Sequence, residues 1–344
     1  MSSPPAPPAP RPTRAPAAVL RLGTRGSALA LAQSRQVAAA LTRAGGARVD
    51  LVTITTHGDT SREHLAQIGG TGVFVSTLRD ALLDGAIDLA VHSLKDLPTA
   101  TPDRLALAAV PQREDPRDAL VARDGLTLQQ LTDSGRPVRI GTGSPRRAAQ
   151  LHAWAAHSGA DLRAVPVRGN VDTRIELVRS GRLDAVVLAA AGLTRLDRLA
   201  EATHLLDTEL MLPAPGQGAL AIECRTADRA LADALATLDH APTRAAVTAE
   251  RALLAALEAG CSAPVGALAT WGPDPDAPAR PPRELRLRAL VGSGDGSLTL
   301  QSSATALLTR HQAQQQAAAL GHELAGRLLA AGATQLSREP APRA

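Results

Sequence analysis

Short apolar runs alternate with amphipathic stretches through the first two thirds of the chain, and this pattern predicts an α/β fold. We expect an apolar strand at 18–22, a helix at 28–43 and a second strand at 48–55. A further helix at 74–83 precedes a buried strand at 87–91. Strands that alternate with helices in this way are typical of a parallel sheet with helices on both faces, so we expect a doubly wound sheet.

The same pattern returns later in the chain and indicates two similar lobes. The strand end Arg21-Leu22-Gly23-Thr24 has a counterpart in Arg139-Ile140-Gly141-Thr142, and both segments lead into a helix. A second pair of segments places an aspartate, Asp88 or Asp184, between a helix that ends at glycine and a buried strand. Two joined α/β lobes normally bind a ligand between them, beyond the carboxyl ends of their strands, so we expect a cleft there.

The rest of the chain divides around these lobes. We expect one lobe over 18–112, joined by 213–238, and the other lobe over 118–212. A smaller α+β domain is expected over 240–335. Its strands are expected at 264–271, 284–291 and 297–305, and its long helix at 309–331. Residues 1–17 are rich in proline and alanine and are expected to be a disordered tail.

Composition narrows the classes of function. The chain has one phenylalanine, two tryptophans and no tyrosine, whereas single-stranded nucleic-acid binding usually relies on aromatic side chains. Its 33 acids nearly balance its 37 bases, and it has no basic run that could follow a phosphate backbone. No apolar stretch has the length of a membrane span. Two cysteines are too few for a disulfide framework, which favours a reducing, cytoplasmic location.

Arginines recur where a predicted strand ends and a helix follows, at the edge of the sheet where ligands bind. Ser144 is positioned to cap one such helix, whose free N–H groups and dipole favour an anion. Arg146 and Arg147 oppose that dipole unless an anion compensates them. One arginine alone would indicate only a charged surface residue, but several together predict a ligand with many carboxylates. The residues placed in this way are Arg25, Ser27, Ser144, Arg146, Arg147, Arg168, Arg174 and Arg195.

Three further positions suggest chemistry. Lys95 is the only lysine among 37 basic residues, and Asp96 beside it makes the pair either a candidate for catalysis or a solvated ion pair. Cys261 follows a helix end, where its thiol is either an accessible nucleophile and attachment point or a small buried residue. Cys224 lies inside an apolar strand and is expected to be buried. The histidines and acids show no metal-ligand spacing, so no metal site is expected.

In order and combination, these segments closely resemble the porphobilinogen deaminase (hydroxymethylbilane synthase) family. The resemblance runs from about residue 19 to 270 and more loosely to the C-terminus. The motifs that carry it are Gly23-Thr24-Arg25-Gly26-Ser27, Val91-His92-Ser93-Leu94-Lys95-Asp96-Leu97-Pro98, Arg113-Glu114-Asp115-Pro116-Arg117-Asp118, Arg168-Gly169-Asn170-Val171, Pro215-Gly216-Gln217-Gly218 and Gly260-Cys261. The sequence departs from the family pattern at His57, Thr71, Pro145, Ala259 and Ser262. These departures concern loop contacts more than the chemistry.

The resemblance implies two doubly wound lobes like those of periplasmic binding proteins, with a cleft between them, and a C-terminal domain that carries the cofactor cysteine. It implies a transferase that deaminates four porphobilinogen molecules and joins them head to tail into hydroxymethylbilane, for tetrapyrrole and heme biosynthesis. A dipyrromethane cofactor, attached to Cys261 through a thioether, primes the chain. Two cofactor rings and four substrate rings bring up to twelve carboxylates, which explains the set of arginines.

By the same resemblance, Asp96 is the catalytic carboxylate, which stabilises the positive charge that develops on pyrrole nitrogen. The loop 56–72 is a candidate lid, with Gly70 and Gly72 in it and Phe74 next to it. The residues implied to bind the cofactor are Cys261, Lys95, Ser144, Arg146, Arg147 and Arg168. Those implied to bind the substrate are Arg25, Ser27, Arg174 and Arg195.

Other classes of protein share some of these features. A solute-binding protein for a carboxylated ligand would have the two lobes and the arginines, but it would leave Cys261 and Lys95-Asp96 without a purpose. A basic nucleic-acid-binding protein would show an affinity that falls steeply with salt. A nicotinamide dehydrogenase is disfavoured because Arg146 replaces the third glycine of its motif. We expect a cytoplasmic monomer that acts on porphobilinogen and binds neither nucleic acid nor a membrane.

Overall fold

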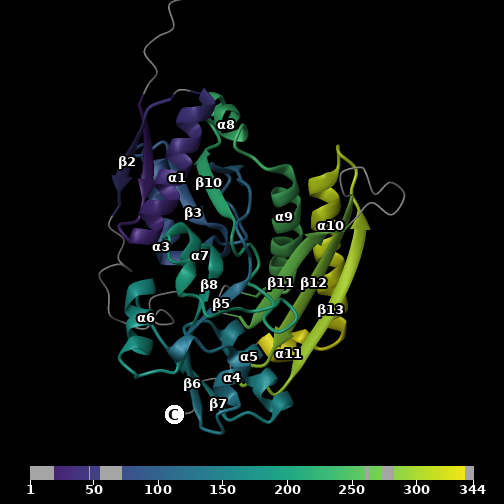
Figure 1. The fold of residues 1–344 in the computed structure, drawn as a ribbon. Helices are drawn as coiled ribbons and strands as arrows, with labels where there is room; N and C mark the ends of the chain where they lie inside the picture. Colours follow the sequence, from purple (N-terminus) through teal and green to yellow (C-terminus); the bar gives the residue numbers. More distant parts are fainter. Residues whose placement is uncertain (1–18, 46, 55–71, 260–262, 273–282, 338–344) are drawn as a thin grey trace, which may run out of the picture.

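The computed structural model describes residues 19–45, 47–54, 72–259, 263–272 and 283–337, and the structural statements below concern these residues. They form three sheets, each with helices packed against it (Figure 1). Two five-stranded sheets lie one above the other, and a three-stranded sheet stands beside both (Figure 1). This arrangement confirms the expected α/β fold of two lobes and a smaller C-terminal domain.

The sheet of the first lobe has four strands that run the same way and one that runs against them. Its strands lie in the order β2 (Val49–Thr53), β1 (Leu20–Thr24), β3 (Leu89–Ser93), β10 (Leu220–Arg225) and β4 (Leu105–Ala109). Helices α1 (Ala28–Gly45) and α8 (Arg229–Ala236) cover one face, and α3 (Gly72–Leu83) covers the other. Successive residues of β3 face opposite ways, so Leu89 lies in the core under α1 and Ala90 in the core under α3.

The sheet of the second lobe has the same plan. Its strands lie in the order β7 (Leu162–Pro166), β6 (Val138–Thr142), β8 (Ala185–Ala189), β5 (Asp118–Ala122) and β9 (His204–Leu205). Helices α4 (Leu128–Thr132) and α5 (Pro145–Ser158) cover one face. Helices α6 (Val171–Arg179) and α7 (Ala190–Arg195) cover the other face.

Both sheets are mixed, which corrects the expectation of a parallel sheet. In the first lobe β10 pairs antiparallel with β3 and β4, and in the second lobe β5 pairs antiparallel with β8 and β9. Each reversed strand follows a segment that crosses from the other lobe, so it enters its sheet from the opposite end. An apolar run looks the same in either direction, and for this reason the sequence pattern did not reveal the reversal.

The two sequence repeats occupy equivalent places in the two sheets. Strands β1 and β6, which carry the repeated motif, are both second in the order of their sheets. The backbone N–H of Arg21 donates to Asp88 Oδ2 at 2.9 Å, and the N–H of Arg139 donates to Asp184 Oδ2 at 2.8 Å. Each aspartate therefore ties its turn to the neighbouring strand, and the repeat is confirmed as a structural one.

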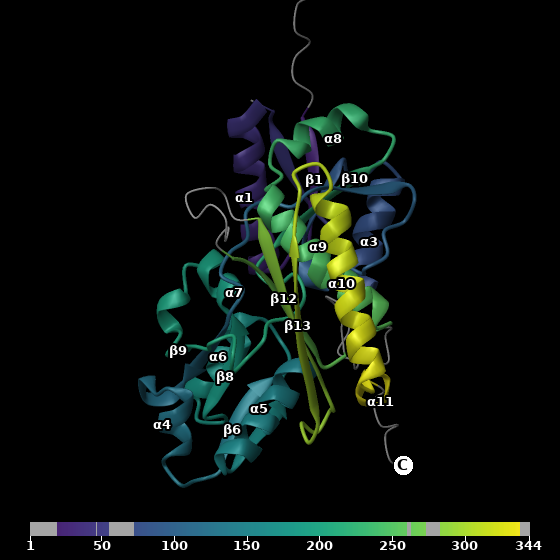
Figure 2. The same ribbon diagram turned by 90° about the vertical axis from the view of Figure 1, so that its right-hand side faces the viewer.

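The C-terminal domain is an antiparallel sheet with two long helices on one face (Figure 2). Its strands lie in the order β11 (Val265–Trp271), β12 (Glu284–Gly292) and β13 (Thr299–Leu307). Its helices are α9 (Ala241–Ala256), α10 (Ala313–Ala330) and α11 (Ala333–Ser337). A Cβ at Gly321 of α10 would lie 2.3 Å from the carbonyl oxygen of Ala249, so glycine allows α9 and α10 to approach closely. The three strands lie where the sequence predicted them.

Short 3₁₀ turns complete the described elements. They are η1 (Leu94–Asp96), η2 (Arg123–Gly125) and η3 (Leu199–Glu201). The predicted tail at 1–17 and nearly all of the predicted lid loop at 56–72 lie outside the described residues. Within the described residues, no helix is long and apolar enough to cross a membrane.

Candidate active site

Lys95 and Asp96 stand at the end of the central strand of the first lobe. Strand β3 ends at Ser93 and passes directly into the turn η1. Leu94 and Leu97 are almost completely buried and anchor this turn, while Lys95 and Asp96 between them are half-buried. The buried leucines fix the orientation of the turn, so the two charged side chains are presented at the carboxyl end of the strand.

The backbone of this turn is held from two sides. The N–H of Leu94 donates to the carbonyl of Ala219, next to β10, at 3.0 Å. The Arg251 guanidinium, on α9, donates to the carbonyls of Leu97 and Pro98 at 2.8 and 2.7 Å. The C-terminal domain and the strand that returns to the first lobe therefore both position η1.

A chain of hydrogen bonds connects Lys95 with the second lobe. Its Nζ donates to Gln217 Oε1 at 3.1 Å. The Nε2 of the buried Gln217 donates to Asp118 Oδ1 and to the carbonyl of Pro116, both at 2.8 Å. Asp118 begins β5, so a single amide group joins the two lobes at the point where the chain crosses between them.

Burial lowers the pKa of Lys95 to about 8. Asp96 and Asp118 oppose this shift, and the guanidinium groups of Arg146 and Arg147 add to it. An ammonium group in this setting gains stability from an additional negative charge. Lys95 is therefore suited to receive a ligand carboxylate.

The Asp96 carboxylate has no hydrogen-bond or ion-pair partner among the described residues. Within that part of the chain Lys95 bonds to Gln217 and forms no ion pair with Asp96. This geometry disfavours the alternative that Lys95 and Asp96 are only a solvated ion pair.

Arg146 and Arg147 open α5, and both turn into the protein. Arg146 Nη2 lies 2.8 Å from Asp118 Oδ2, and Arg147 Nη2 lies 2.7 Å from Asp118 Oδ1. Burial would raise the pKa of Asp118, but the two guanidinium groups hold it well below its usual range. The anion that the start of α5 requires is therefore supplied by the protein itself. Arg146 Nε is buried and has no hydrogen-bond partner among the described residues, so one donor is still unused.

The two predicted capping serines differ. Ser27 Oγ accepts a hydrogen bond from the N–H of Ala30 at 3.3 Å, as expected for the start of α1. Ser144 occupies the N-cap position of α5, but its side chain makes no capping bond. Pro145 follows it and has no N–H to satisfy. The hydroxyl group of Ser144 is therefore available to a ligand.

The remaining predicted arginines also follow strands. Arg174 and Arg195 are half-buried, and burial lowers the pKa of both. Arg174 Nε donates to the carbonyl of Gly169 at 3.0 Å, and Arg195 Nη2 donates to the carbonyl of Gly218 at 2.6 Å. Arg195 thus contacts the segment that returns to the first lobe.

Arg25 is half-buried directly after β1, and Arg168 is exposed after β7. These positions match the sequence expectation that the arginines stand where strands end. Cys261 and Gly70 lie outside the described residues, while Gly72 and Phe74 belong to the first turn of α3. Cys224 is buried in β10 with a free thiol, as expected.

Two residues of this site were not expected from the sequence, namely Asp118 and Gln217. A signal for Asp118 was available, because an acid at the start of a fully buried strand is nearly always paired. The only signal for Gln217 was its place in the Pro215-Gly216-Gln217-Gly218 motif, because a glutamine between two glycines is otherwise typical of a loop.

Two family models match the chain. "Porphobilinogen deaminase, dipyromethane cofactor binding domain" matches residues 20–233, and "Porphobilinogen deaminase, C-terminal domain" matches residues 244–330. Porphobilinogen deaminase 1 of Streptomyces avermitilis is 62% identical, over 93% of this chain and 98% of its own. The protein of the same name from Streptomyces coelicolor is 60% identical, over 94% and 98%. Porphobilinogen deaminase of Thermobifida fusca is 54% identical, over 93% and 96%.

Solved structures with a partly similar fold are far more distant in sequence. A periplasmic substrate-binding protein of an ABC transporter from Coxiella burnetii has a TM-score of 0.40 and 13% identity, over 65% of this chain and 93% of its own. Immunogenic lipoprotein A from Vibrio vulnificus also has a TM-score of 0.40, with 12% identity over 64% and 94%. The fold assignment above rests on the sheets of this chain.

Proposed function

Because the chain belongs to the porphobilinogen deaminase family, we propose that it assembles a linear tetrapyrrole from porphobilinogen. The protein is then a transferase that removes ammonia from four porphobilinogen molecules and joins them head to tail into hydroxymethylbilane. The observation that carries this proposal is the placement of Lys95 and Asp96 at the end of β3, linked through Gln217 to the buried cations of the second lobe.

Asp96 stabilises the positive charge of the reaction. This charge develops on pyrrole nitrogen when porphobilinogen loses ammonia and again when the next ring attacks. A carboxylate that is fixed in place accepts hydrogen bonds from the pyrrole N–H groups and needs no reorganisation as the charge appears. It can also take up and return a proton. The lack of a partner for Asp96 within the described residues supports this role.

The residues present fit a ligand that is rich in carboxylates. The Nε atoms of Arg146 and Arg195 are buried without a hydrogen-bond partner in the described part of the chain. The hydroxyl of Ser144 and the ammonium of Lys95 supply further donors. For the cofactor we assign Lys95, Ser144, Arg146, Arg147 and Arg168. For the substrate we assign Arg25, Ser27, Arg174 and Arg195.

Cys261 is proposed to hold the dipyrromethane cofactor through a thioether, in keeping with the match to the cofactor-binding family model. When bound, this group supplies the free pyrrole position from which the product chain grows. The protein's own part is to fix that position against Asp96 and to neutralise the acidic side chains around it.

We propose that each of the three sheets belongs to a part of the protein that supplies different residues of the site. Residues 18–112 with 213–238 form the lobe of Asp96, residues 118–212 form the lobe of the paired arginines, and residues 240–335 carry Cys261. The loop that contains Gly70 and leads to Gly72 and Phe74 at the start of α3 is proposed as a lid over the site between the lobes.

We place this enzyme in the cytoplasm, as a monomer that binds porphobilinogen and binds neither nucleic acid nor a membrane. The free thiol of Cys224 suits a reducing compartment. The small number of aromatic residues, with one phenylalanine and two tryptophans, gives few surfaces on which bases could stack.

Asp96→Asn tests the central role. We expect the variant to keep a covalent adduct on the peptide that contains Cys261 and to lose about a hundredfold or more in kcat, because a fixed charge opposite the reacting nitrogen is removed. Asp103→Asn is the matched control, since Asp103 is an exposed acid seven residues after Asp96 in the sequence. Intact mass and peptide mapping report the adduct, and hydroxymethylbilane formation reports turnover.

Near-normal turnover of Asp96→Asn would refute the role of Asp96. If the unchanged protein carries no adduct on the Cys261 peptide, even after incubation with porphobilinogen, the proposed function itself is wrong.

A further inference from the structure

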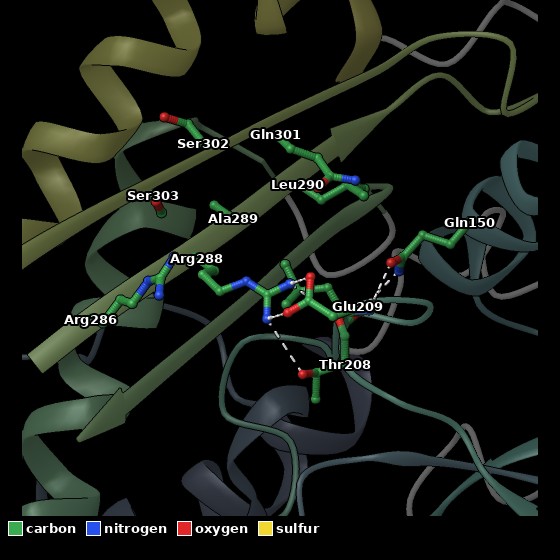
Figure 3. A pocket seen from close by; sticks show the side chains of 11 residues that line it. Gln150, Thr208, Glu209, Arg286, Arg288, Ala289, Leu290, Gln301, Ser302 and Ser303 are labelled. Carbon is green, nitrogen blue, oxygen red and sulfur yellow. Dashed lines mark hydrogen bonds and ion pairs between the residues drawn. The ribbon is translucent and has the colours of Figure 1, made fainter. Parts of the chain in front are cut away.

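A cavity of about 240 Å³ lies between the second lobe and the C-terminal sheet (Figure 3). Helix α5 and the 207–212 turn form its wall on the side of the second lobe, and β12 and β13 form the opposite wall. The helices α9 and α10 cover the other face of this sheet, so the cavity lies on the face that they leave open. None of the arginines of the candidate active site lines it.

An arginine in one wall of the cavity forms an ion pair with a carboxylate of the protein itself. Arg288 projects from β12 and meets Glu209 of the turn (Figure 3). Arg288 Nη1 lies 2.5 Å from Glu209 Oε1, and Arg288 Nη2 lies 2.7 Å from Glu209 Oε2. The side chain of Arg288 is 22% exposed, whereas that of Glu209 is 76% exposed. The arginine is therefore built into the wall, and the carboxylate reaches it from the solvent.

An ion pair of this kind is easily exchanged. Pairing of an exposed carboxylate contributes little net free energy, because water solvates the carboxylate almost as well when it is released. The guanidinium of Arg288 is less exposed, so water solvates it less well than it solvates Glu209 when the pair is broken. A ligand carboxylate can therefore take the place of Glu209 on Arg288.

A second guanidinium stands beside the first. Arg286 lies two residues before Arg288 on β12, so both side chains project from the same face of the sheet. Among the described residues Arg286 has no hydrogen bond or ion pair, and its cross-strand partners are both threonines. Glu284, the next acid on this face, does not pair with it within those residues. Two arginines against Glu209 leave the cavity with one uncompensated positive charge.

The rest of the lining suits a small organic acid. Leu212 and Leu290 belong to one buried apolar cluster where the second lobe meets the sheet. Gln301 and Ser303 lie on β13, and Ser303 is directly opposite Arg288. Their side chains make no hydrogen bond with another described residue, so they add neutral donors and acceptors to the apolar and cationic surfaces.

We propose that this cavity is a second binding site, for a small dicarboxylic acid. Arg286 binds one carboxylate, and Arg288 binds the other in place of Glu209. Residues two apart on a strand are about 7 Å apart, and long arginine side chains can converge from that separation on the two ends of a five-carbon diacid. Charge-assisted hydrogen bonds hold the two ends, and the leucines cover the methylene groups between them.

Calorimetric titration of the full-length, cofactor-loaded protein with glutarate tests this proposal. The candidate active site also contains arginines, so variants have to identify which binding event belongs to the cavity. Arg286→Ser should weaken one class of sites about tenfold, because one charged hydrogen-bond donor group is lost. Glu209→Gln should tighten the same class several-fold, because the competing carboxylate is gone. Arg310→Ser removes the same charge from an exposed position outside the cavity and should change nothing.

Both key substitutions are at solvent-accessible side chains, and thermal melting will show that the variants are folded. The proposal is overturned if Arg286→Ser and Glu209→Gln titrate like the unchanged protein. It is also overturned if acetate, which carries one carboxylate, binds this class of sites as tightly as glutarate does. The Arg310→Ser control distinguishes a site from a general effect of surface charge, because a general effect would weaken binding in that variant as well.

Discussion

At the scale of single residues, the state of Lys95 is set by groups that are far apart in the sequence. Its ammonium group bonds to Gln217, which bonds in turn to Asp118. Asp118 is already shared by Arg146 and Arg147. Moving any residue of this hydrogen-bond network therefore changes the electrostatic surroundings of Lys95, although none of the other residues is close to Lys95 in the sequence.

We expect Lys95 to bind a carboxylate of the cofactor less tightly as the pH rises through about 8, because burial lowers the pKa of Lys95 to about 8. Lys95 binds a carboxylate only in its protonated form, which is the dominant form below that pH. The pH profile of kcat/KM, which reports the free enzyme, should show this alkaline limb. Lys95→Arg stays charged over the same range and should lack the limb. An unchanged limb in that variant would assign it to another group.

The charged residues of the site could be predicted from local sequence, but their partners could not. Arg146 and Arg147 were identified because they stand at a helix start, where an anion is needed. That the anion is Asp118 depends on how β5 and α5 lie together in the fold. Gln217 becomes part of the site only because the return segment passes between the lobes, which no local pattern encodes.

At the scale of elements, the two lobes use the same ties. At the end of the reversed strand β10, Arg225 Nη2 lies 3.4 Å from Asp88 Oδ1. After the reversed strand β5, Arg123 Nε lies 3.1 Å from Asp184 Oδ1. Each aspartate also accepts a backbone N–H from the second strand of its sheet, β1 or β6. One carboxylate per lobe therefore joins three elements of the sheet.

Asp88→Ala and Asp184→Ala should each lower the free energy of unfolding by about 2 kcal/mol at neutral pH, because charged hydrogen bonds are lost. Burial opposes the shift, but the bonds from arginine hold the pKa of both carboxyls below the ordinary value of 3.8. Their contribution is therefore complete above that pH and is lost as the pH falls below it. Urea unfolding at neutral and acid pH measures this, with the exposed Asp80→Ala as control. Equal losses at both pH values would contradict the assignment.

The sequence was a good guide to where elements begin and end, and a poor guide to their direction. The strands of the C-terminal domain lie where the apolar alternation placed them. The reversal of β5 and β10 is set by the route of the chain between lobes. A strand buried on both faces, such as β5 with its run of buried residues, shows no feature that depends on direction.

At the scale of the whole molecule, one buried glutamate joins all three parts. Glu250, on α9, accepts hydrogen bonds from Arg113 Nη1 at 2.7 Å, from the N–H of Gly216 at 2.6 Å and from the N–H of Ala269 at 2.9 Å. Arg113 lies on the segment that leaves the first lobe, and Gly216 lies on the segment that returns to it. Ala269 belongs to β11. The crossing segments are therefore fixed against the C-terminal domain.

Glu250→Gln should lower the free energy of unfolding by about 3–5 kcal/mol, because it leaves Arg113, whose side chain is only 10% exposed, without its counter-charge. Glu323→Gln is the matched control. It removes the same charge from a half-exposed ion pair with Arg327 on α10, and such pairs contribute about 0.5 kcal/mol or less. Urea unfolding of the two variants gives the comparison. Similar losses in both would show that Glu250 does not join the parts in the way described.

The position of β10 between β3 and β4 has a consequence for the order in which a newly made chain folds. The sheet of the second lobe uses residues 118–205 alone, so it is complete once that stretch has left the ribosome. The sheet of the first lobe still lacks its inner strand until residue 225 has been made. Until then β3 and β4 present unpaired edges. The lobe that is synthesised first is therefore completed after the second lobe, and its strand edges stay exposed until then.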